Sequence, residues 1–470
     1  CSFGEFNDGC GKLMSVFGSS LLGFLLAVAI LVTVHEMGHY LAARWCKVKV
    51  IRFSVGFGPV LLKWVGKRSI FAGTEFAISA IPLGGYVRML DTRDPDLIDA
   101  HNVDTRAAFN KQSLWKRSVI VAAGPLANFI LAAFLYAVAL SVPDRDLTAF
   151  VAKPEANTPA AIAGMRGGEN ILRINDRAVA HWGDVRWALL TSLFDTELKL
   201  DVEQRSVERR VTLTRGENSP ATLDSVGSRL AGWGLAFDQP AIIGTVKEGG
   251  PAAAAGLKTG DQIVTVDGQA IRQWTQLTKV IQGAPGGRVA LGVSRQGTTQ
   301  EIVINPRAEL VAKVSVGRID VGAISPLKLG DSWLTERQRS IPEAIVAAVQ
   351  RTYDASALTV RLLWGMLTGD VSLRQISGPL TMAEGAGSTL SQGAVAFTLF
   401  LAIVSISIGV LNLLPVPMLD GGQLLYHLLE ALKGAPLSER AEVFGQRVGI
   451  GFVTALTALA LYNDFLRIIS

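Results

Sequence analysis

The chain has 470 residues, of which 49% are hydrophobic and 18% are charged, and its formal net charge is +5. Its length allows about three domains. Lys and Arg outnumber Asp and Glu by 13 to 6 in residues 44–117, so the positive charge is concentrated there and gives no reason to expect a nucleic-acid partner.

Four stretches with almost no charge follow one another along the chain. Residues 13–43 contain Glu36 as their only charged group, and residues 118–143, 385–419 and 448–463 contain none. About 20 apolar residues cross a bilayer as a helix, and the last, shorter run reaches that length if the Arg447 side chain extends to the interface. Uncharged runs this long are rare outside membranes, which disfavours a soluble enzyme with buried core helices.

The sequence therefore predicts a polytopic α-helical membrane protein with four transmembrane helices. Basic loops stay in the cytoplasm, so the loop after the first span is expected inside, and both termini and the long central segment outside. The predicted segments are a non-native N-terminal extension at 1–13, transmembrane helices at 14–45, 118–143, 393–432 and 447–467, a cytoplasmic membrane-associated β region at 46–117, two tandem extracytoplasmic α+β domains at 144–236 and 237–312, and a linker with amphipathic helices at 313–392.

The first span contains an ionisable cluster in "LVTVHEMGHYLAARW". On a helix, His35 and His39 lie on one face, four residues apart, with Glu36 beside them. This is the H-E-x-x-H arrangement, in which two histidines bind Zn²⁺ and the glutamate acts as general base. Desolvation makes such groups costly in lipid, so they are expected to be functional there. A histidine pair lining a proton or ion path is the alternative.

The cytoplasmic loop carries "GTEFAISAIPLGGYVRML" at residues 73–90. Alternating apolar residues indicate a strand, which Pro82 and the pair Gly84-Gly85 interrupt. An unpaired strand edge near the membrane could accept an extended guest peptide. An ordinary cytoplasmic hairpin fits the same pattern.

An internal repeat lies in the long extracytoplasmic segment. Residues 159–182 align without gaps to residues 251–274, at an offset of 92, and share the Pro-Ala-Ala start and the final Trp. The pattern resembles PDZ domains of the bacterial, circularly permuted type. The second copy has Asp261 at its Gly-Asp turn, whereas the first departs from this pattern with Glu169.

The resemblance implies a peptide-carboxylate loop just before the first groove strand. "AGWGLAF" is the best match for the second domain, which makes Gly234, Leu235 and Ala236 candidate groove residues. Domains that act only as spacers or steric filters are an equally good interpretation. Farther on, residues 340–367 have apolar residues at helical spacing, typical of an interfacial amphipathic helix or of a helix packed on neighbouring protein.

The third span ends with a polar residue after a break. In "NLLPVPMLDGG", Pro415 and Pro417 must interrupt the helix, and Asp420 follows. Broken helix at membrane depth is tolerated only where protein or a watery cavity satisfies the backbone. We therefore expect Asp420 to enter the same cavity as the two histidines and to be the third metal ligand. His427 is a rival ligand, and an aspartate that merely marks a turn is the simpler alternative.

These motifs together resemble the bacterial site-2 protease family of intramembrane zinc metalloproteases, and most closely its regulator of sigma-E protease type. The resemblance covers essentially the whole chain from Met14 and includes "HEMGH", "GFGPVL", "IPLGGYVRML", "AAGPLANF", "SGPLTMAEGAG" and "NLLPVPMLDG". It implies one Zn²⁺ per chain on His35, His39 and Asp420, with Glu36 as the catalytic glutamate.

The resemblance also implies how substrate is held. Asn412 matches an asparagine that holds the substrate backbone near the metal, and the segment with Gly84, Gly85 and Tyr86 matches a β region that steadies an unwound substrate. The implied substrates are single-span membrane proteins already shortened on the outer side, such as an anti-sigma factor in envelope stress and remnant signal peptides.

By the same resemblance the protein is expected in the bacterial inner membrane, with both termini and the PDZ domains periplasmic and the active site toward the cytoplasm. Membrane lipid and transmembrane substrates are the expected partners. A non-enzymatic scaffold would not need Glu36, and a metal transporter would need ligands on successive spans, so both alternatives are weaker.

Overall fold

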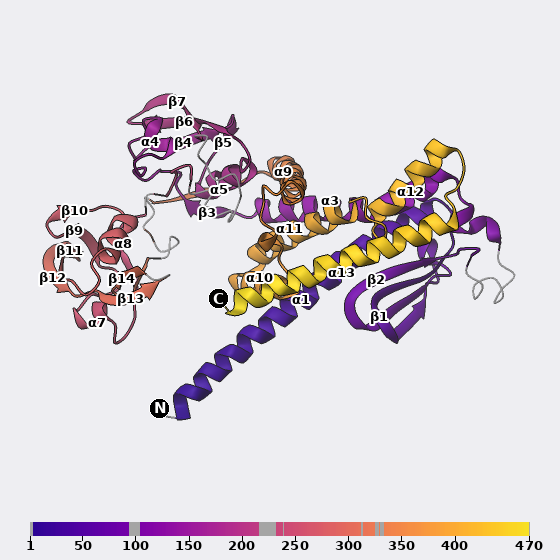
Figure 1. The fold of residues 1–470 in the computed structure, drawn as a ribbon, viewed down its shortest axis with the longest axis horizontal. Helices are drawn as coiled ribbons and strands as arrows, with labels where there is room; N and C mark the ends of the chain where they lie inside the picture. The colour runs from indigo at the N-terminus through magenta and orange to yellow at the C-terminus, as the bar shows by residue number, and fades with distance from the viewer. Residues whose placement is uncertain are drawn as a thin grey trace. The chain divides into compact units, whose positions relative to one another are not determined.

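The computed structural model describes residues 3–93, 104–215, 232–237, 239–311, 314–324, 329 and 333–469 (Figure 1). The chain divides into two compact units. The helical unit comprises Cys1–Val142 and Arg339–Ser470, and the strand-rich unit comprises Pro143–Gln338. The second unit is thus an insertion between two helices of the first.

Four helices of the described chain are long and apolar enough to cross a membrane, at Gly18–Trp45, Leu114–Ser141, Ala394–Asn412 and Arg440–Arg467. They lie in α1 (Phe3–Trp45), α3 (Leu114–Ser141), α11 (Ala394–Asn412) and α13 (Glu439–Ile469). This agrees with the number of spans expected from the sequence. The helix expected at 393–432 is instead two helices, because the proline-containing segment separates α11 from α12 (Asp420–Lys433).

Helix α3 packs against α1, α11 and α9 (Ile341–Thr368). The approach of α3 to α1 is close: a Cβ atom at Gly38 would lie 2.3 Å from the Ala123 carbonyl oxygen. In α9, small residues such as Ala344 and Ala348 are buried, and Trp364 is 67% exposed. Helix α10 (Pro379–Gln392) connects α9 to α11. The predicted amphipathic segment is therefore a helix with one face packed on protein and an apolar face left exposed.

The loop between the first two spans forms a two-stranded antiparallel hairpin of β1 (Val50–Val65) and β2 (Glu75–Met89). Its base is anchored by an aromatic cluster in which Phe53 and Phe76 pack on Tyr40 of α1. Toward the other end the apolar side chains are exposed. Gly84 has φ +122°, and a Cβ there would lie 2.1 Å from the Phe57 ring, so only glycine fits.

The strand-rich unit contains two similar four-stranded sheets, ordered β5-β4-β6-β7 and β10-β9-β11-β12. The same sequence of elements builds each one, which confirms the structural basis of the repeat. The first copy has α4 (Pro159–Ile162), β4 (Asn170–Ile174), β5 (Arg177–Ala178), α5 (Trp182–Thr191), β6 (Glu197–Gln204) and β7 (Val207–Thr214). The second has α7 (Pro251–Ala254), β9 (Gln262–Val266), β10 (Gln269–Ala270), α8 (Trp274–Gln282), β11 (Val289–Arg295) and β12 (Thr298–Ile304).

The described part of this unit also contains shorter strands. β13 (Arg307–Val311) pairs with β14 (Val314–Arg318), and β15 (Val321–Ala323) pairs with β8 (Ile243–Val246). The entry strand β3 (Asp144–Leu147) pairs with the exit strand β16 (Leu334–Arg337), so the chain enters and leaves the unit at one place.

The assignment of "AGWGLAF" to the second domain is wrong. Trp233 and Leu235 lie in the hydrophobic core of the first domain, and Ala152 N–H donates to the Ala236 carbonyl. Ala160 N–H donates to the Trp233 carbonyl, and its repeat counterpart Ala252 donates to the Ile319 carbonyl. The segment with Trp233 is therefore the last part of the first domain, and the segment with Ile319 is its counterpart at the end of the second domain.

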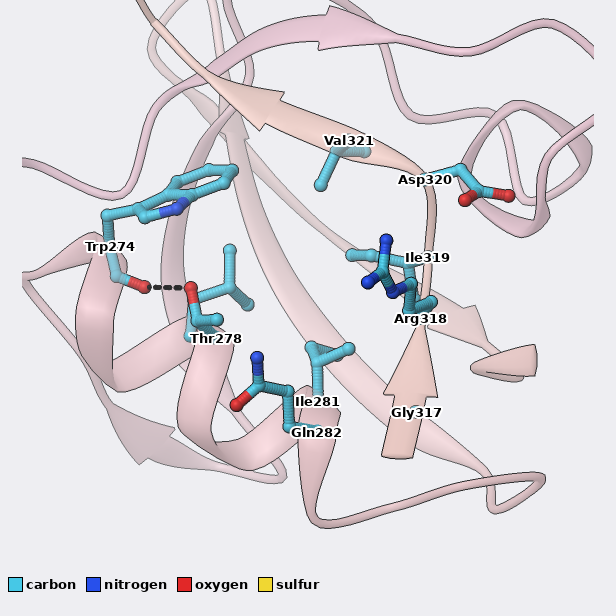
Figure 2. Close-up of a pocket in the computed structure, with 10 residues that line it drawn as sticks. Trp274, Thr278, Ile281, Gln282, Gly317, Arg318, Ile319, Asp320 and Val321 are labelled. Atoms are coloured by element: carbon cyan, nitrogen blue, oxygen red, sulfur yellow. Dashed lines mark hydrogen bonds between the residues drawn. The ribbon is translucent and has the colours of Figure 1, made fainter. Parts of the chain in front are cut away.

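The candidate groove of the second domain lies elsewhere (Figure 2). A cavity of about 210 Å³ lies between α8 and the strand segment from Gly317 to Val321. Ile319 belongs to the second domain's core, so this domain extends to Ala323 and not to the expected boundary at residue 312. In the first domain, the corresponding segment contains Trp233 and ends at Phe237, and Trp333 packs on the Phe237 ring.

A candidate zinc centre between two helices

Three donor side chains converge inside the helical unit. His35 and His39 come from α1, and Asp420 is the first residue of α12. The two Nε2 atoms are 3.3 Å apart and lie 3.2 and 3.4 Å from Asp420 Oδ2. This is the one group of three or more His, Cys, Asp or Glu side chains within metal-binding distance that the described residues provide. The structure thus brings together the three ligands expected from the sequence.

A tight turn brings Asp420 to the histidines. Met418 has φ 108°, which is rare for a non-glycine residue. The two glycines after Asp420 press on the preceding turn: a Cβ at Gly421 would lie 2.3 Å from the Leu413 carbonyl oxygen, and one at Gly422 would lie 2.3 Å from that of Val416. The sequence Asp-Gly-Gly is therefore required by close backbone approach and does more than mark a turn.

Helix α3 orients both histidine rings from behind. His39 Nδ1 donates to the Ile120 carbonyl at 2.8 Å, and His35 Nδ1 lies 3.2 Å from the Asn128 side-chain amide. Gly124 leaves room for the His39 ring, since a Cβ there would lie 2.3 Å from Nε2. Hydrogen bonds at Nδ1 direct Nε2 of each ring toward the convergence point.

Glu36 lies beside the same point. It lines a cavity of about 240 Å³ together with His39, Asp420 and Gln423. Val87 of β2 provides a backbone hydrogen bond to the Glu36 carboxylate, and a Cβ at Gly85 would lie 3.2 Å from Glu36 Cγ. The hairpin therefore reaches the metal centre, and Gly85 is small because the glutamate passes against it.

The donor set fits zinc. Two imidazole nitrogens and one carboxylate oxygen are a usual three-ligand set for catalytic Zn²⁺, with a fourth position left for water. Asp420 Oδ2 is buried without a hydrogen-bond partner among the described residues, although both histidine Nε2 atoms lie near it. A buried carboxylate oxygen needs compensation, and a cation at this point would supply it.

The other candidate residues lie around the centre. Asn412 is the last residue of α11, half-buried, and Tyr86 is on β2 with its hydroxyl 3.4 Å from Arg52. His427 lies apart from the metal cluster, with its Nδ1 3.1 Å from Ser118 Oγ. Burial and the nearby Arg117 guanidinium hold the pKa of His427 below its usual value. His427 is thus tied to α3 in a separate cluster.

Sequence reasoning missed one residue of the site, Asn128. It is fully buried and touches a proposed ligand, and the signal was present: it is the one Asn, Gln or charged residue in the uncharged run 118–143. A polar amide in the middle of a lipid-soluble helix needs a partner. The partner could not be identified, because it depends on how α1 and α3 pack.

Known proteins are similar over nearly the whole chain. The profile of peptidase family M50 matches residues 23–456. A protein of Neisseria meningitidis named a zinc metalloprotease is 37% identical over 461 residues, covering 96% of this chain and 99% of its own length. The regulator of sigma-E protease RseP of Escherichia coli is 36% identical over 455 residues, covering 95% and 98%. That of Haemophilus influenzae is 36% identical, covering 96% and 99%.

Among solved structures, the PDZ domain of an SdrC-like protein from Listeria monocytogenes aligns with 19% of this chain and 90% of its own, at 23% identity and a TM-score of 0.17. The family profile and the full-length relatives agree with the convergence of two histidines, a glutamate and an aspartate described above. The chain belongs to peptidase family M50, the site-2 proteases, and is a zinc metalloprotease.

Proposed function

We propose that this protein is an intramembrane endopeptidase that cleaves single-span membrane proteins within the bilayer. One Zn²⁺ per chain would be held by His35, His39 and Asp420. The observation that carries the proposal is the convergence of these three donors beside Glu36, with both histidines and the glutamate on α1, a helix that is apolar enough to cross a membrane.

Each residue of the centre has a distinct part in the reaction. A Zn²⁺ held by these three donors would supply Lewis acidity and would lower the pKa of water at this point toward neutrality. Glu36 accepts the proton of the attacking water and passes it to the leaving amide nitrogen. The Val87 backbone hydrogen bond holds the Glu36 carboxylate in place beside the cavity. Asn412, at the end of α11, holds a backbone group of the substrate.

The hairpin supports substrate unwinding. A transmembrane helix has its carbonyl groups hydrogen-bonded internally, so the scissile bond is exposed only after local unwinding. The β2 strand around Gly84, Gly85 and Tyr86 passes against the catalytic glutamate, and Phe57 and Ile81 expose apolar surface nearby. Strand addition to the hairpin would satisfy the released backbone groups at the metal.

The relatives' names support the biological setting that we propose. Relatives are named regulator of sigma-E protease. The substrates of this proposal are an anti-sigma factor and remnant signal peptides, cut after a first cleavage outside. We place the protein in the bacterial inner membrane, with both termini and the strand-rich unit in the periplasm. The two repeat domains would act as PDZ domains that keep out substrates with bulky outer parts.

The decisive experiment compares Glu36→Gln with the parent after reconstitution with a tagged, truncated single-span substrate. Cleavage is expected to fall by at least about 10³-fold, with zinc content unchanged, because the proton acceptor is lost and the ligands are kept. Glu248→Gln, an exposed glutamate of the strand-rich unit, is the matched control and should cleave normally. Equal cleavage by Glu36→Gln and parent would refute the mechanism.

A further inference from the structure

The two histidines of the zinc centre are held by different kinds of group on the same face of α3. Ile120, Gly124 and Asn128 follow one another at four-residue intervals, so they are neighbours along one side of the helix. His39 Nδ1 faces the Ile120 carbonyl, and His35 Nδ1 faces the Asn128 side chain. Helix α3 therefore contacts the Nδ1 atoms of both imidazole rings.

The Ile120 carbonyl leaves His39 only one tautomer. A carbonyl oxygen can only accept, so His39 Nδ1 must carry the proton that it donates at 2.8 Å. A neutral imidazole has one such proton, and the lone pair of His39 Nε2 is consequently free to bind a cation. The backbone fixes this ligand, and no side-chain substitution on α3 can remove the acceptor.

Asn128 does not impose a tautomer in the same way. A carboxamide has a donor end and an acceptor end of nearly equal shape, which a half-turn about the Cβ–Cγ bond exchanges. With Nδ2 facing His35 Nδ1 at 3.2 Å, the ring nitrogen must accept, and the imidazole proton is on Nε2. In that orientation Asn128 Oδ1 is buried without a hydrogen-bond partner among the described residues.

The exchanged orientation frees His35 Nε2 of its proton and gives Asn128 Oδ1 a hydrogen-bond partner. If Oδ1 faces His35 Nδ1, the ring donates from Nδ1, its Nε2 lone pair points to Asp420 and His39, and the orphaned oxygen gains its partner. We propose that Asn128 is the positioning residue of zinc ligand His35, and that its Oδ1 accepts the Nδ1–H bond whenever His35 Nε2 binds the metal.

The position of Asn128 is itself well determined. Its side chain is fully buried, and Ser405 Oγ of α11 donates to its backbone carbonyl at 2.8 Å. The residue is thus fixed by a contact between α3 and α11, and only the terminal amide is free to exchange its two ends. A positioning role needs this combination of a fixed backbone and a polar tip at the ligand.

The proposal rests on the proposed zinc site and is tested on the full-length protein in detergent. Zinc affinity is measured by competition with a chromophoric chelator in the parent, Asn128→Leu, Asn128→Asp and Ser405→Ala. Leucine has nearly the same volume but no acceptor, so Asn128→Leu should bind zinc about 10–100-fold more weakly. Aspartate keeps the acceptor, so Asn128→Asp should bind at least as tightly as the parent.

Two further measurements distinguish a role of Asn128 in positioning His35 from a role in helix packing alone. Ser405→Ala removes a hydrogen bond to the same residue without touching His35, so its zinc affinity should stay within about two-fold of the parent. Asn128→Leu leaves His35 Nδ1 without its partner, so the metal-stripped variant should melt somewhat below the metal-stripped parent, and its melting curve shows whether the protein is folded when zinc affinity is measured.

Several results would overturn the proposal: parental zinc affinity in folded Asn128→Leu, equal weakening in Asn128→Leu and Ser405→Ala, or weakening in Asn128→Asp. The last remains decisive if Asn128→Leu does not fold. Asp420→Asn is measured alongside. If it loses zinc while Asn128→Leu does not, only the role of Asn128 fails, and if it keeps zinc, the proposed site itself fails.

Discussion

Two aspartates of this protein, one buried and one half-buried, are compensated in opposite ways. Asp261, in the second repeat domain, is 1% exposed and accepts a two-pronged hydrogen bond from Arg295, at 2.7 Å to each oxygen. The ion-pair partners of Asp420 among the described residues are His35 and His39, which carry charge only when protonated, and its Oδ2 has no hydrogen-bond partner there. We call the Asp261–Arg295 pair closed, because both carboxylate oxygens have a partner, and it contributes to stability. We call the Asp420 cluster open, because one oxygen has none and can bind a cation.

Glu169 stands between these cases. It is the counterpart of Asp261 in the first repeat domain and is fully buried, and Arg209 reaches one of its oxygens at 3.2 Å. The other oxygen has no hydrogen-bond partner among the residues described. The longer side chain thus gives a looser ion pair in the first repeat domain than Asp261 has in the second.

The largest effect should come from Asp420→Asn. The amide removes the negative ligand from the open cluster, so zinc affinity should fall by about 100-fold or more, and cleavage with it. Zinc per chain is measured by elemental analysis, and proteolysis with the truncated substrate. The exposed Asp370→Asn is the control. Unchanged zinc content would show that another residue, such as His427, is the third ligand.

Arg295→Met breaks the closed pair and should act on stability alone. It leaves Asp261 buried without its counter-ion, and the melting temperature of the strand-rich unit should fall by roughly 10 °C. Zinc content should stay at the parental level. Thermal unfolding of the full-length protein, followed by circular dichroism, checks the first expectation. A loss of zinc in this variant would contradict the expectation that the Asp261–Arg295 pair affects stability and not metal binding.

The pH dependence of the same pair sharpens the contrast. Burial alone would raise the pKa of Asp261, but the Arg295 guanidinium and the Lys258 N–H outweigh it and hold the pKa below its ordinary value. A carboxyl with a lowered folded pKa stabilises the fold above its unfolded pKa and loses that contribution in more acid solution. Acidification from pH 7 to about pH 3 should therefore lower the melting temperature more in the parent than in Arg295→Met. Parallel curves for the two proteins would disprove this.

Arg209→Met should have the smallest effect. The Glu169–Arg209 contact is longer and single, and Arg166 N–H still donates to Glu169 after the substitution. We expect a melting-temperature drop of about 5 °C, or roughly half that of Arg295→Met, because a looser pair contributes less. The two variants are compared in one calorimetric series. A larger drop for Arg209→Met would reverse the proposed ranking of the two pairs.

The local parts of this architecture were readable from the sequence. The spacing of His35, Glu36 and His39 predicted that they share one part of a helix, and the two prolines before Asp420 predicted the break between α11 and α12. Hydrophobic runs gave the four candidate spans, and the 92-residue offset gave the repeat. Each of these signals depends on residues close together in the chain or on direct self-similarity.

The predictions that were wrong or missing concern contacts between segments that are distant in the sequence. Trp233 lies just before the second domain in sequence, but it belongs to the first domain's core, because the last segment of each repeat domain pairs beside its first strand. Only the pairing of Ala160 with Trp233 and of Ala252 with Ile319 reveals this. The role of Asn128 likewise appears only once α1 lies against α3.

The separation of the zinc donors along the chain has a consequence for biosynthesis. The ribosome makes α1 with both histidines and Glu36 at the start, whereas Asp420 emerges only near the end, after the whole strand-rich unit. Until then the histidine pair lacks its third donor. On the proposed ligand set, a newly made chain is therefore expected to gain activity only after α12 has been synthesised and has packed against α1.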